Sequence, residues 1–150
     1  MATVLADDAL RRVNADARGG TCAIVIFGGS GDLTKRKIIP ALFNASKEGL
    51  LPANFTIIGC GRPAMSQDEY RKMVNEALHN FAKAGEVDQN VLKQFVDNVF
   101  FVGGGFEEDR VYSELEALLQ SNCKSRGCTD NRIYYLSTPP SAFAVIINKL

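Results

Sequence analysis

Residues 24–35 read IVIFGGSGDLTK, and this stretch decides the fold. Its four leading apolar residues are typical of a strand buried on both faces, as in a parallel sheet. Gly28, Gly29 and Gly31 have no Cβ, so the backbone there can take a positive φ and admit a close neighbour. Asp32 is a candidate cap for the helix that follows. Because a helix start presents free amides and partial positive charge, the stretch predicts a binding site for a phosphate or diphosphate.

The glycine spacing alone does not settle this interpretation. Gly28 and Gly31 are spaced G-x-x-G, and Thr34 stands where a dinucleotide-binding turn would carry a third glycine. A tight turn without any ligand has the same composition. The position directly after a strand favours the dinucleotide site.

Strand and helix patterns alternate along the rest of the chain. Apolar runs predict strands at 22–27, 55–59, 99–102 and 132–136. Capping signals and helical spacing predict helices at 32–37, from Pro40 to Gly49, from the capping box Ser66–Glu69 to Gly85, from Asp88 onward, at 108–124 and after Pro140. A single regular helix over 32–48 is not expected, because an interior proline costs about 3 kcal/mol. The order predicts an α/β fold, a Rossmann-like doubly wound parallel sheet with helices on both faces.

The four predicted strands are fewer than the five or six of a complete doubly wound sheet. Residues 1–20 are predicted to be a flexible tail, and residues 21–150 the N-terminal part of the domain. The last helix would carry Phe143, Ile146, Ile147 and Leu150 on one face, and the sequence stops within this apolar pattern. We therefore expect a truncated domain, with a C-terminal substrate and catalytic domain absent from this chain.

Composition narrows the possible partners. The chain of 150 residues has 17 basic and 17 acidic side chains, so nucleic acid is not an expected partner. No apolar run approaches the roughly 20 residues of a membrane span, and no membrane association is expected. The four cysteines form no C-x-x-C pair and there is one histidine, so no metal site is expected. Cys22 and Cys60 are interpreted as buried, reduced thiols, which favours the cytoplasm.

Arg62 bears on the choice of cofactor. In dinucleotide folds a carboxylate after the second strand binds the ribose of NAD, whereas an arginine accommodates the 2′-phosphate of NADP. Here Arg62 follows the strand and no acid occurs before Asp68. The sequence therefore favours NADP, although an ordinary surface arginine is the alternative interpretation.

A longer string makes the assignment more specific. Residues 28–37, GGSGDLTKRK, resemble the GASGDLAKKK signature of the glucose-6-phosphate dehydrogenase family. Residues 49–52 match the family's GLLP, and residues 131–140 resemble the segment that contains FYLALPP, with Ser137-Thr138 in place of Ala-Leu. The resemblance covers about residues 22–150.

The resemblance implies a set of NADP-binding residues. In the family a lysine at the position of Lys35 lies near the cofactor, an arginine at Arg62 contacts the 2′-phosphate, and a tyrosine at Tyr135 lies beside the cofactor; for Tyr135 an ordinary core aromatic is the alternative. The implied cofactor-binding residues are Gly28, Gly29, Ser30, Gly31, Asp32, Leu33, Thr34, Lys35, Arg62 and Tyr135.

The resemblance also implies an activity. Family members oxidise glucose 6-phosphate to 6-phosphogluconolactone with NADP as hydride acceptor, the first step of the oxidative pentose phosphate pathway, and the full-length protein would be a homo-oligomer. The catalytic histidine of RIDHYLGK and the lysine of EKPFG are missing, and His79 fits a helix surface better than a catalytic role. We expect this chain alone to bind coenzyme weakly, if at all, and not to turn over.

Two other functions stay open. One is a non-catalytic NADP-binding sensor or regulatory module. The other is a nucleotide-sugar or short-chain dehydrogenase, which Thr34 and the lack of a Tyr-x-x-x-Lys pair disfavour.

Overall fold

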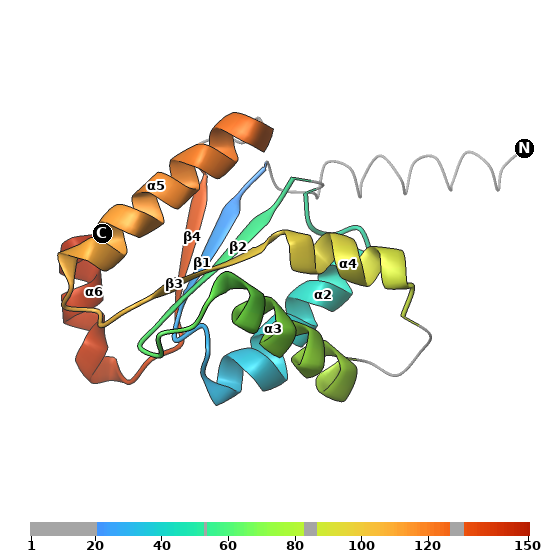
Figure 1. Cartoon of the computed structure of the whole chain (residues 1–150), viewed down its shortest axis with the longest axis horizontal. Coiled ribbons are helices and arrows are strands. Elements are labelled where there is room, and N and C mark those ends of the chain that lie inside the picture. Colours follow the sequence, from blue (N-terminus) through green and yellow to red (C-terminus); the bar gives the residue numbers. More distant parts are fainter. Residues whose placement is uncertain (1–20, 53, 83–86, 127–130) are drawn as a thin grey trace, which may run out of the picture.

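The computed structural model describes residues 21–52, 54–82, 87–126 and 131–150 (Figure 1). Its strands are β1 (Ala23–Phe27), β2 (Thr56–Gly61), β3 (Val99–Gly103) and β4 (Arg132–Leu136). Its helices are α2 (Ile39–Lys47), α3 (Gln67–Phe81), α4 (Gln89–Asp97), α5 (Asp109–Arg126) and α6 (Phe143–Lys149), with a π-turn η1 (Thr34–Ile38) and a 3-10 turn η2 (Pro140–Ala142). The predictions for residues 1–20 and for Gly85 lie outside the described residues.

The four strands form one parallel sheet in the order β3-β2-β1-β4. The predicted α/β Rossmann-like sheet is therefore confirmed. Strand order reverses direction at β1, so β1 and β4 flank the switch point of the sheet. In open parallel sheets ligands bind beyond the carboxyl ends of the strands at such a point.

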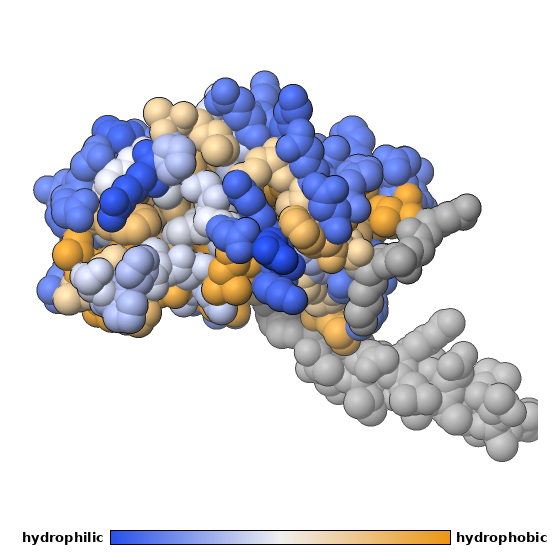
Figure 2. All heavy atoms as spheres, turned by 90° about the horizontal axis from the view of Figure 1, so that it is seen from below, coloured by the Kyte–Doolittle hydropathy of each residue, from blue (hydrophilic) through white to orange (hydrophobic). Residues whose placement is uncertain are grey.

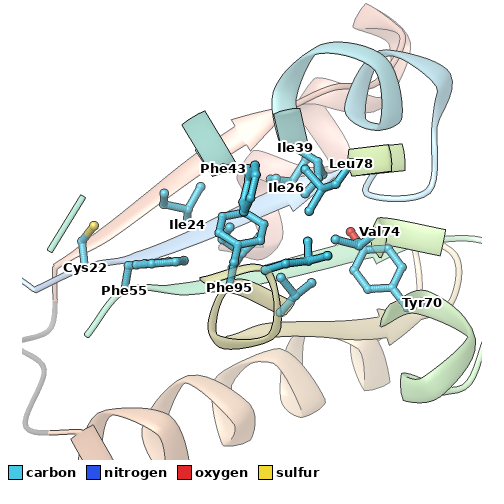
Figure 3. Close-up of a cluster of buried hydrophobic side chains, with 13 residues drawn as sticks. Cys22, Ile24, Ile26, Ile39, Phe43, Phe55, Tyr70, Val74, Leu78 and Phe95 are labelled. Carbon is cyan, nitrogen blue, oxygen red and sulfur yellow. The ribbon is translucent and has the colours of Figure 1, made fainter. Parts of the chain in front are cut away.

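Helices cover both faces of the sheet, as expected (Figure 1). On one face α2, α3 and α4 bury a cluster that includes Phe43, Tyr70 and Phe95 (Figure 3). On the other face α5 and α6 bury a second cluster around Phe27 of β1. The rings of Phe43 and Phe95 pack edge to face with centroids 5.2 Å apart. These two apolar layers hold the strand ends that carry the site.

The helical segment after the glycines is irregular, and Pro40 explains why. The amide of Ile39 donates to the carbonyl of Thr34, five residues back, which makes the π-turn. Pro40 then lies in the first turn of α2, where its missing N–H costs nothing. As expected, residues 32–48 do not form one regular helix. The predicted cap is wrong, since Asp32 lies inside the first helical turn and its carboxylate is 3.9 Å from the guanidinium of Arg36.

The predicted capping signals later in the chain are confirmed. Ser66 and Glu69 form a reciprocal capping box at the start of α3, and the Asp88 side chain accepts from the amide of Asn90 at the start of α4. The amide side chain of Gln67 donates to Val99 and accepts from the backbone of Phe101, so it occupies hydrogen-bonding groups along the β3 edge.

The opposite edge strand, β4, and helix α6 leave apolar side chains exposed. Ile133 is 50% exposed and Tyr135 is 45% exposed on one face of β4. The predicted apolar face of the last helix is only partly buried: Ile146 packs into the core, whereas Phe143, Ile147 and Leu150 are exposed. Among the described residues, these three side chains keep between 36% and 61% of their surface exposed. The same described residues contain no helix long and apolar enough to span a bilayer.

Candidate functional site

The glycine turn, residues 28–31, lies where β1 ends. Gly28 has a φ of +86°, which a residue with a Cβ rarely adopts. The amides of Gly28 and Gly29 both donate to the carbonyl of Cys60 in β2, at 2.8 and 3.0 Å, and the Gly31 amide donates to Gly28 at 2.9 Å. The turn is thus fastened across the end of the neighbouring strand.

Neighbouring backbone leaves no room for side chains on the first two glycines. A Cβ on Gly28 would stand 2.1 Å from the carbonyl oxygen of Ser137, and one on Gly29 would stand 2.5 Å from the α-carbon of Gly59. The amide of Ser137 in turn donates to Phe27 at 2.8 Å. The close approach predicted for these glycines is confirmed, and the groups that approach are the ends of β2 and β4.

Two buried hydroxyls bind the carbonyls of the turn. The hydroxyl of Thr34 donates to the Gly28 carbonyl at 2.8 Å, and the hydroxyl of Tyr70 in α3 donates to the Gly29 carbonyl at 3.0 Å. Both side chains are fully buried. Burial raises the pKa of Tyr70, so its hydroxyl stays protonated and remains a donor.

Three amides at this corner remain open. Within the described part of the chain, no hydrogen bond takes up the amides of Ser30, Asp32 and Leu33. They belong to the turn and to the first helical turn, where a macrodipole adds partial positive charge. Together they offer donors of the kind that bind a phosphate or diphosphate.

Cationic residues follow the glycine turn and the end of β2. Arg62 is exposed directly after β2, and no ion pair engages it among the residues that the structure describes. Arg36, by contrast, pairs with Asp32 and lies 5.5 Å from the ring centre of Phe81. Lys35 is half-buried and has no ion pair within the same set of residues. Of the two arginines, Arg62 is the one available to an anionic ligand.

Tyr135 lies on the α2 face of β4. It lines a groove of about 530 Å³ together with Leu33 and Lys37. Tyr134 packs with the opposite cluster, so the expected alternation of the two tyrosines is confirmed. In the following turn the buried hydroxyl of Thr138 has no hydrogen-bond partner among the described residues. The amides of the glycine turn and the Arg62 guanidinium, which has no ion pair among the described residues, are donors of the kind that bind a dinucleotide.

Other reactive groups lie elsewhere. His79 Nδ1 is 2.8 Å from the backbone oxygen of Asn75 on α3, consistent with the predicted helix-surface role. Cys22 and Cys60 are buried, as predicted, and burial raises the pKa of Cys60 to about 12. Cys128 and the side chain of Cys123 lie outside the described residues. No group of three potential metal ligands occurs within the described residues.

Sequence reasoning missed the role of Tyr70 and of the two glycines in β2. A Cβ on Gly59 would stand 2.2 Å from the Tyr70 hydroxyl, and one on Gly61 would stand 2.9 Å from Ser30 Oγ. The alternating glycines of Ile-Gly-Cys-Gly were the available signal, since glycine inside a strand often marks a close approach. Nothing local to Tyr70 indicates a partner 41 residues away.

Comparison with known proteins agrees with this geometry. Residues 25–150 match the family model described as glucose-6-phosphate dehydrogenase, NAD binding domain. The glucose-6-phosphate 1-dehydrogenase of Chlamydia muridarum is 40% identical over 129 residues, which are 86% of this chain and 25% of that protein. The chloroplastic glucose-6-phosphate 1-dehydrogenase 1 of Arabidopsis thaliana is 35% identical, over 85% of this chain and 22% of that protein.

Solved structures of similar proteins match as well. A glucose-6-phosphate dehydrogenase in complex with its substrate glucose 6-phosphate superposes with a TM-score of 0.79 at 32% identity, over 89% of this chain and 27% of that chain. The enzyme from Mycobacterium avium gives a TM-score of 0.73 at 25% identity, over 87% and 26% of the two chains. The chain spans about a quarter of the length of these relatives.

Proposed function

Because the chain belongs to the glucose-6-phosphate dehydrogenase family, we propose that residues 21–150 form its coenzyme-binding part and bind NADP. The observation that carries the proposal is the set of open amides at Ser30, Asp32 and Leu33, together with Arg62, which follows the neighbouring strand and has no ion pair among the described residues. The amides would hold the diphosphate of the cofactor. Gly28, Gly29, Gly31, Thr34, Lys35 and Tyr135 complete the proposed cofactor-binding set.

The preference for NADP over NAD is assigned to Arg62. A guanidinium can bind the 2′-phosphate of NADP with two parallel hydrogen bonds, whereas a carboxylate would repel that phosphate. The first acid after β2 is Asp68, which lies in the first turn of α3. No carboxylate therefore occupies the position that would select the ribose of NAD.

For the enzyme that carries this chain we propose the oxidation of glucose 6-phosphate to 6-phosphogluconolactone, the first step of the oxidative pentose phosphate pathway. Bound NADP would supply the hydride acceptor. The residues of this chain would bind and orient the cofactor, and no catalytic base is assigned among them. The sequence contains neither an EKPFG nor an RIDHYLGK string.

The compartment, oligomeric state and partners of the enzyme are also proposals. We propose that it works in the cytoplasm, where the buried thiols of Cys22 and Cys60 stay reduced, and that the full-length enzyme is a homo-oligomer. Glucose 6-phosphate is the proposed small-molecule partner, and neither nucleic acid nor a membrane is proposed as one.

An activity assay and the coding sequence test the proposed function. With glucose 6-phosphate and NADP, the purified 150-residue chain should give no increase in absorbance at 340 nm, and appreciable turnover would contradict the assignment of this chain to coenzyme binding alone. The coding sequence read past Leu150 should contain the Glu-Lys-Pro-Phe-Gly and Asp-His-Tyr strings. A stop codon directly after Leu150 would favour the alternative function, a non-catalytic NADP-binding sensor.

A further inference from the structure

Two hydroxyls from different elements donate hydrogen bonds to carbonyls of the glycine turn. Thr34 belongs to the π-turn that follows the glycines, and Tyr70 belongs to α3, beyond β2. Tyr70 Oη lies 3.0 Å from the Gly29 carbonyl, and Thr34 Oγ1 lies 2.8 Å from the Gly28 carbonyl. Neither hydroxyl is accessible to solvent, so neither is available to touch a ligand directly.

A carbonyl fixed on one side of a peptide fixes the amide on the other side. In a trans peptide the C=O and the next N–H point in opposite directions. The Gly29 carbonyl shares its peptide with the Ser30 amide, so the hydrogen bond from Tyr70 directs that amide away from the core. The Gly28 carbonyl shares its peptide with the Gly29 amide, which donates to Cys60. Thr34 therefore fixes the orientation of the Gly28–Gly29 peptide, which directly follows the positive φ of Gly28.

The tyrosine itself has little freedom to move. Its ring stacks on Phe101 with centroids 4.5 Å apart, and its oxygen lies where a Cβ on Gly59 would stand. Figure 3 shows Tyr70 beside Val74 at the end of the buried cluster opposite Cys22 and Phe55. A rigid donor keeps the Gly29–Ser30 peptide in one orientation before any ligand arrives, which lowers the ordering cost of binding.

We propose that Tyr70 and Thr34 are positioning residues for the cofactor, which set the Ser30 amide and the glycine turn in the orientation that accepts a diphosphate. The proposal rests on the proposed function, because it assumes that the turn binds NADP. It assigns Tyr70 a role in binding, and it explains the role of Thr34 in the proposed set by a buried hydroxyl that orients the turn.

The test compares two pairs of substitutions. Tyr70→Phe and Thr34→Val each remove a hydroxyl and keep the shape of the side chain. Tyr112→Phe removes a comparable hydrogen bond, from the phenol to the Phe106 carbonyl at 2.8 Å on the α5 side. Thr56→Val removes a buried hydroxyl that has no hydrogen-bond partner among the described residues, at the start of β2.

The measurement is a titration of the ¹⁵N-labelled 150-residue chain with NADP, followed by amide chemical shifts. This readout gives a dissociation constant even for weak binding and shows which amides respond. In the wild type, NADP should shift the amides of Ser30, Asp32 and Leu33. Tyr70→Phe and Thr34→Val should each raise the dissociation constant about 3- to 10-fold, the effect of losing one hydrogen bond. Thr34→Ser should restore affinity, and the two control variants should stay within about twofold of wild type.

The outcomes separate this inference from the proposed function. If the wild type binds and the two hydroxyl variants bind equally well, the positioning role is wrong and the proposed function stands. If NADP shifts none of the three amides in the wild type, the proposed function fails and the positioning role fails with it. Should Tyr70→Phe not fold, the comparison of Thr34→Val with Thr34→Ser decides, because these variants differ in the hydroxyl group.

Discussion

Ser30 Oγ lies over Gly61, so close that a β-carbon on Gly61 would stand 2.9 Å from it. This contact joins the glycine turn to the end of β2, one residue before Arg62. The phosphate-binding amides and the cation proposed to select NADP are therefore held in one corner by small residues. Viewed from the side to which the strands' carboxyl ends point, the surface mixes hydrophilic and hydrophobic areas, so it is not a uniformly charged face (Figure 2).

Among the turn glycines without a positive φ, Gly29 should lose the most stability when it is replaced. Gly29→Ala would place a methyl group 2.5 Å from the α-carbon of Gly59, where both neighbours are backbone and cannot move aside. We expect a loss of about 2–4 kcal/mol in the free energy of unfolding, measured by urea titration. Gly31→Ala is the matched control, because its methyl would meet only the Gly28 carbonyl at 3.1 Å. Equal losses for the two variants would contradict the close approach of the strands.

Phe95 should dominate the core on the α2 side. Its ring lies 5.2 Å from that of Phe43 and 5.6 Å from that of Phe55, and the side chain is 1% exposed. Phe95→Ala should lower the free energy of unfolding by about 3–5 kcal/mol. Phe81→Ala serves as control, since Phe81 is 44% exposed and its removal should cost less than about 1 kcal/mol. A small loss at Phe95 would show that α4 does not pack as described.

The ion pair between Glu116 and Arg132 should make stability depend on pH. Hydrogen bonds from Arg132, and then from Gln120, lower the pKa of Glu116 below its ordinary value of 4.5. A lowered native pKa stabilises the fold above pH 4.5, and this contribution is lost as the pH falls through the native pKa. Because the glutamate is 44% exposed, the contribution should be about 1 kcal/mol or less.

The measurement for this pair is a double-mutant cycle. Thermal unfolding of the wild type, Glu116→Gln, Arg132→Met and the double variant would be followed from pH 7 to pH 3. The coupling between the two positions should be present at neutral pH and vanish toward the acid end of the range. A coupling that stayed constant with pH would contradict the proposed titration of Glu116.

The exposed face of β4 should promote self-association. Ile133 lines the same apolar groove as Leu33 and Tyr135, at an edge strand, and exposed apolar edges favour contact between copies. Ile133→Thr should reduce concentration-dependent association in light scattering without lowering the melting temperature. Leu50→Thr is the control, because Leu50 is 48% exposed but lies outside the groove. An equal effect of both substitutions would mean that the groove has no special role.

Local signals sufficed for most of the fold. The apolar run before Gly28 identified β1, the Ser66–Glu69 spacing identified the start of α3, and Pro40 identified the break before α2. Each signal acts within a few residues of the chain. The π-turn was not predicted, because its register depends on how η1 and α2 pack against α3 as well as on Pro40.

The candidate site was only partly predictable, because some of its contacts join residues that are far apart in the sequence. The glycines and Arg62 are read from strand ends, but the hydrogen bond from Tyr70 to Gly29 joins residues 41 positions apart. Phe143 and Ile147 lie on the predicted apolar face of the last helix and are exposed, because an apolar helical pattern does not say whether a neighbour covers that face. Assigned roles in cofactor binding remain predictions for every residue of the proposed set.

Titration of the 150-residue chain with NADP and, separately, with NAD measures the preference that Arg62 is proposed to create. The wild type should bind NADP at least about tenfold more tightly than NAD, the value of one charge-assisted hydrogen bond or more. Arg62→Ala should abolish the preference, whereas Arg36→Ala should keep it, because Arg36 already pairs with Asp32. Equal affinity for the two cofactors, or a preference that survives Arg62→Ala, would contradict the proposed site.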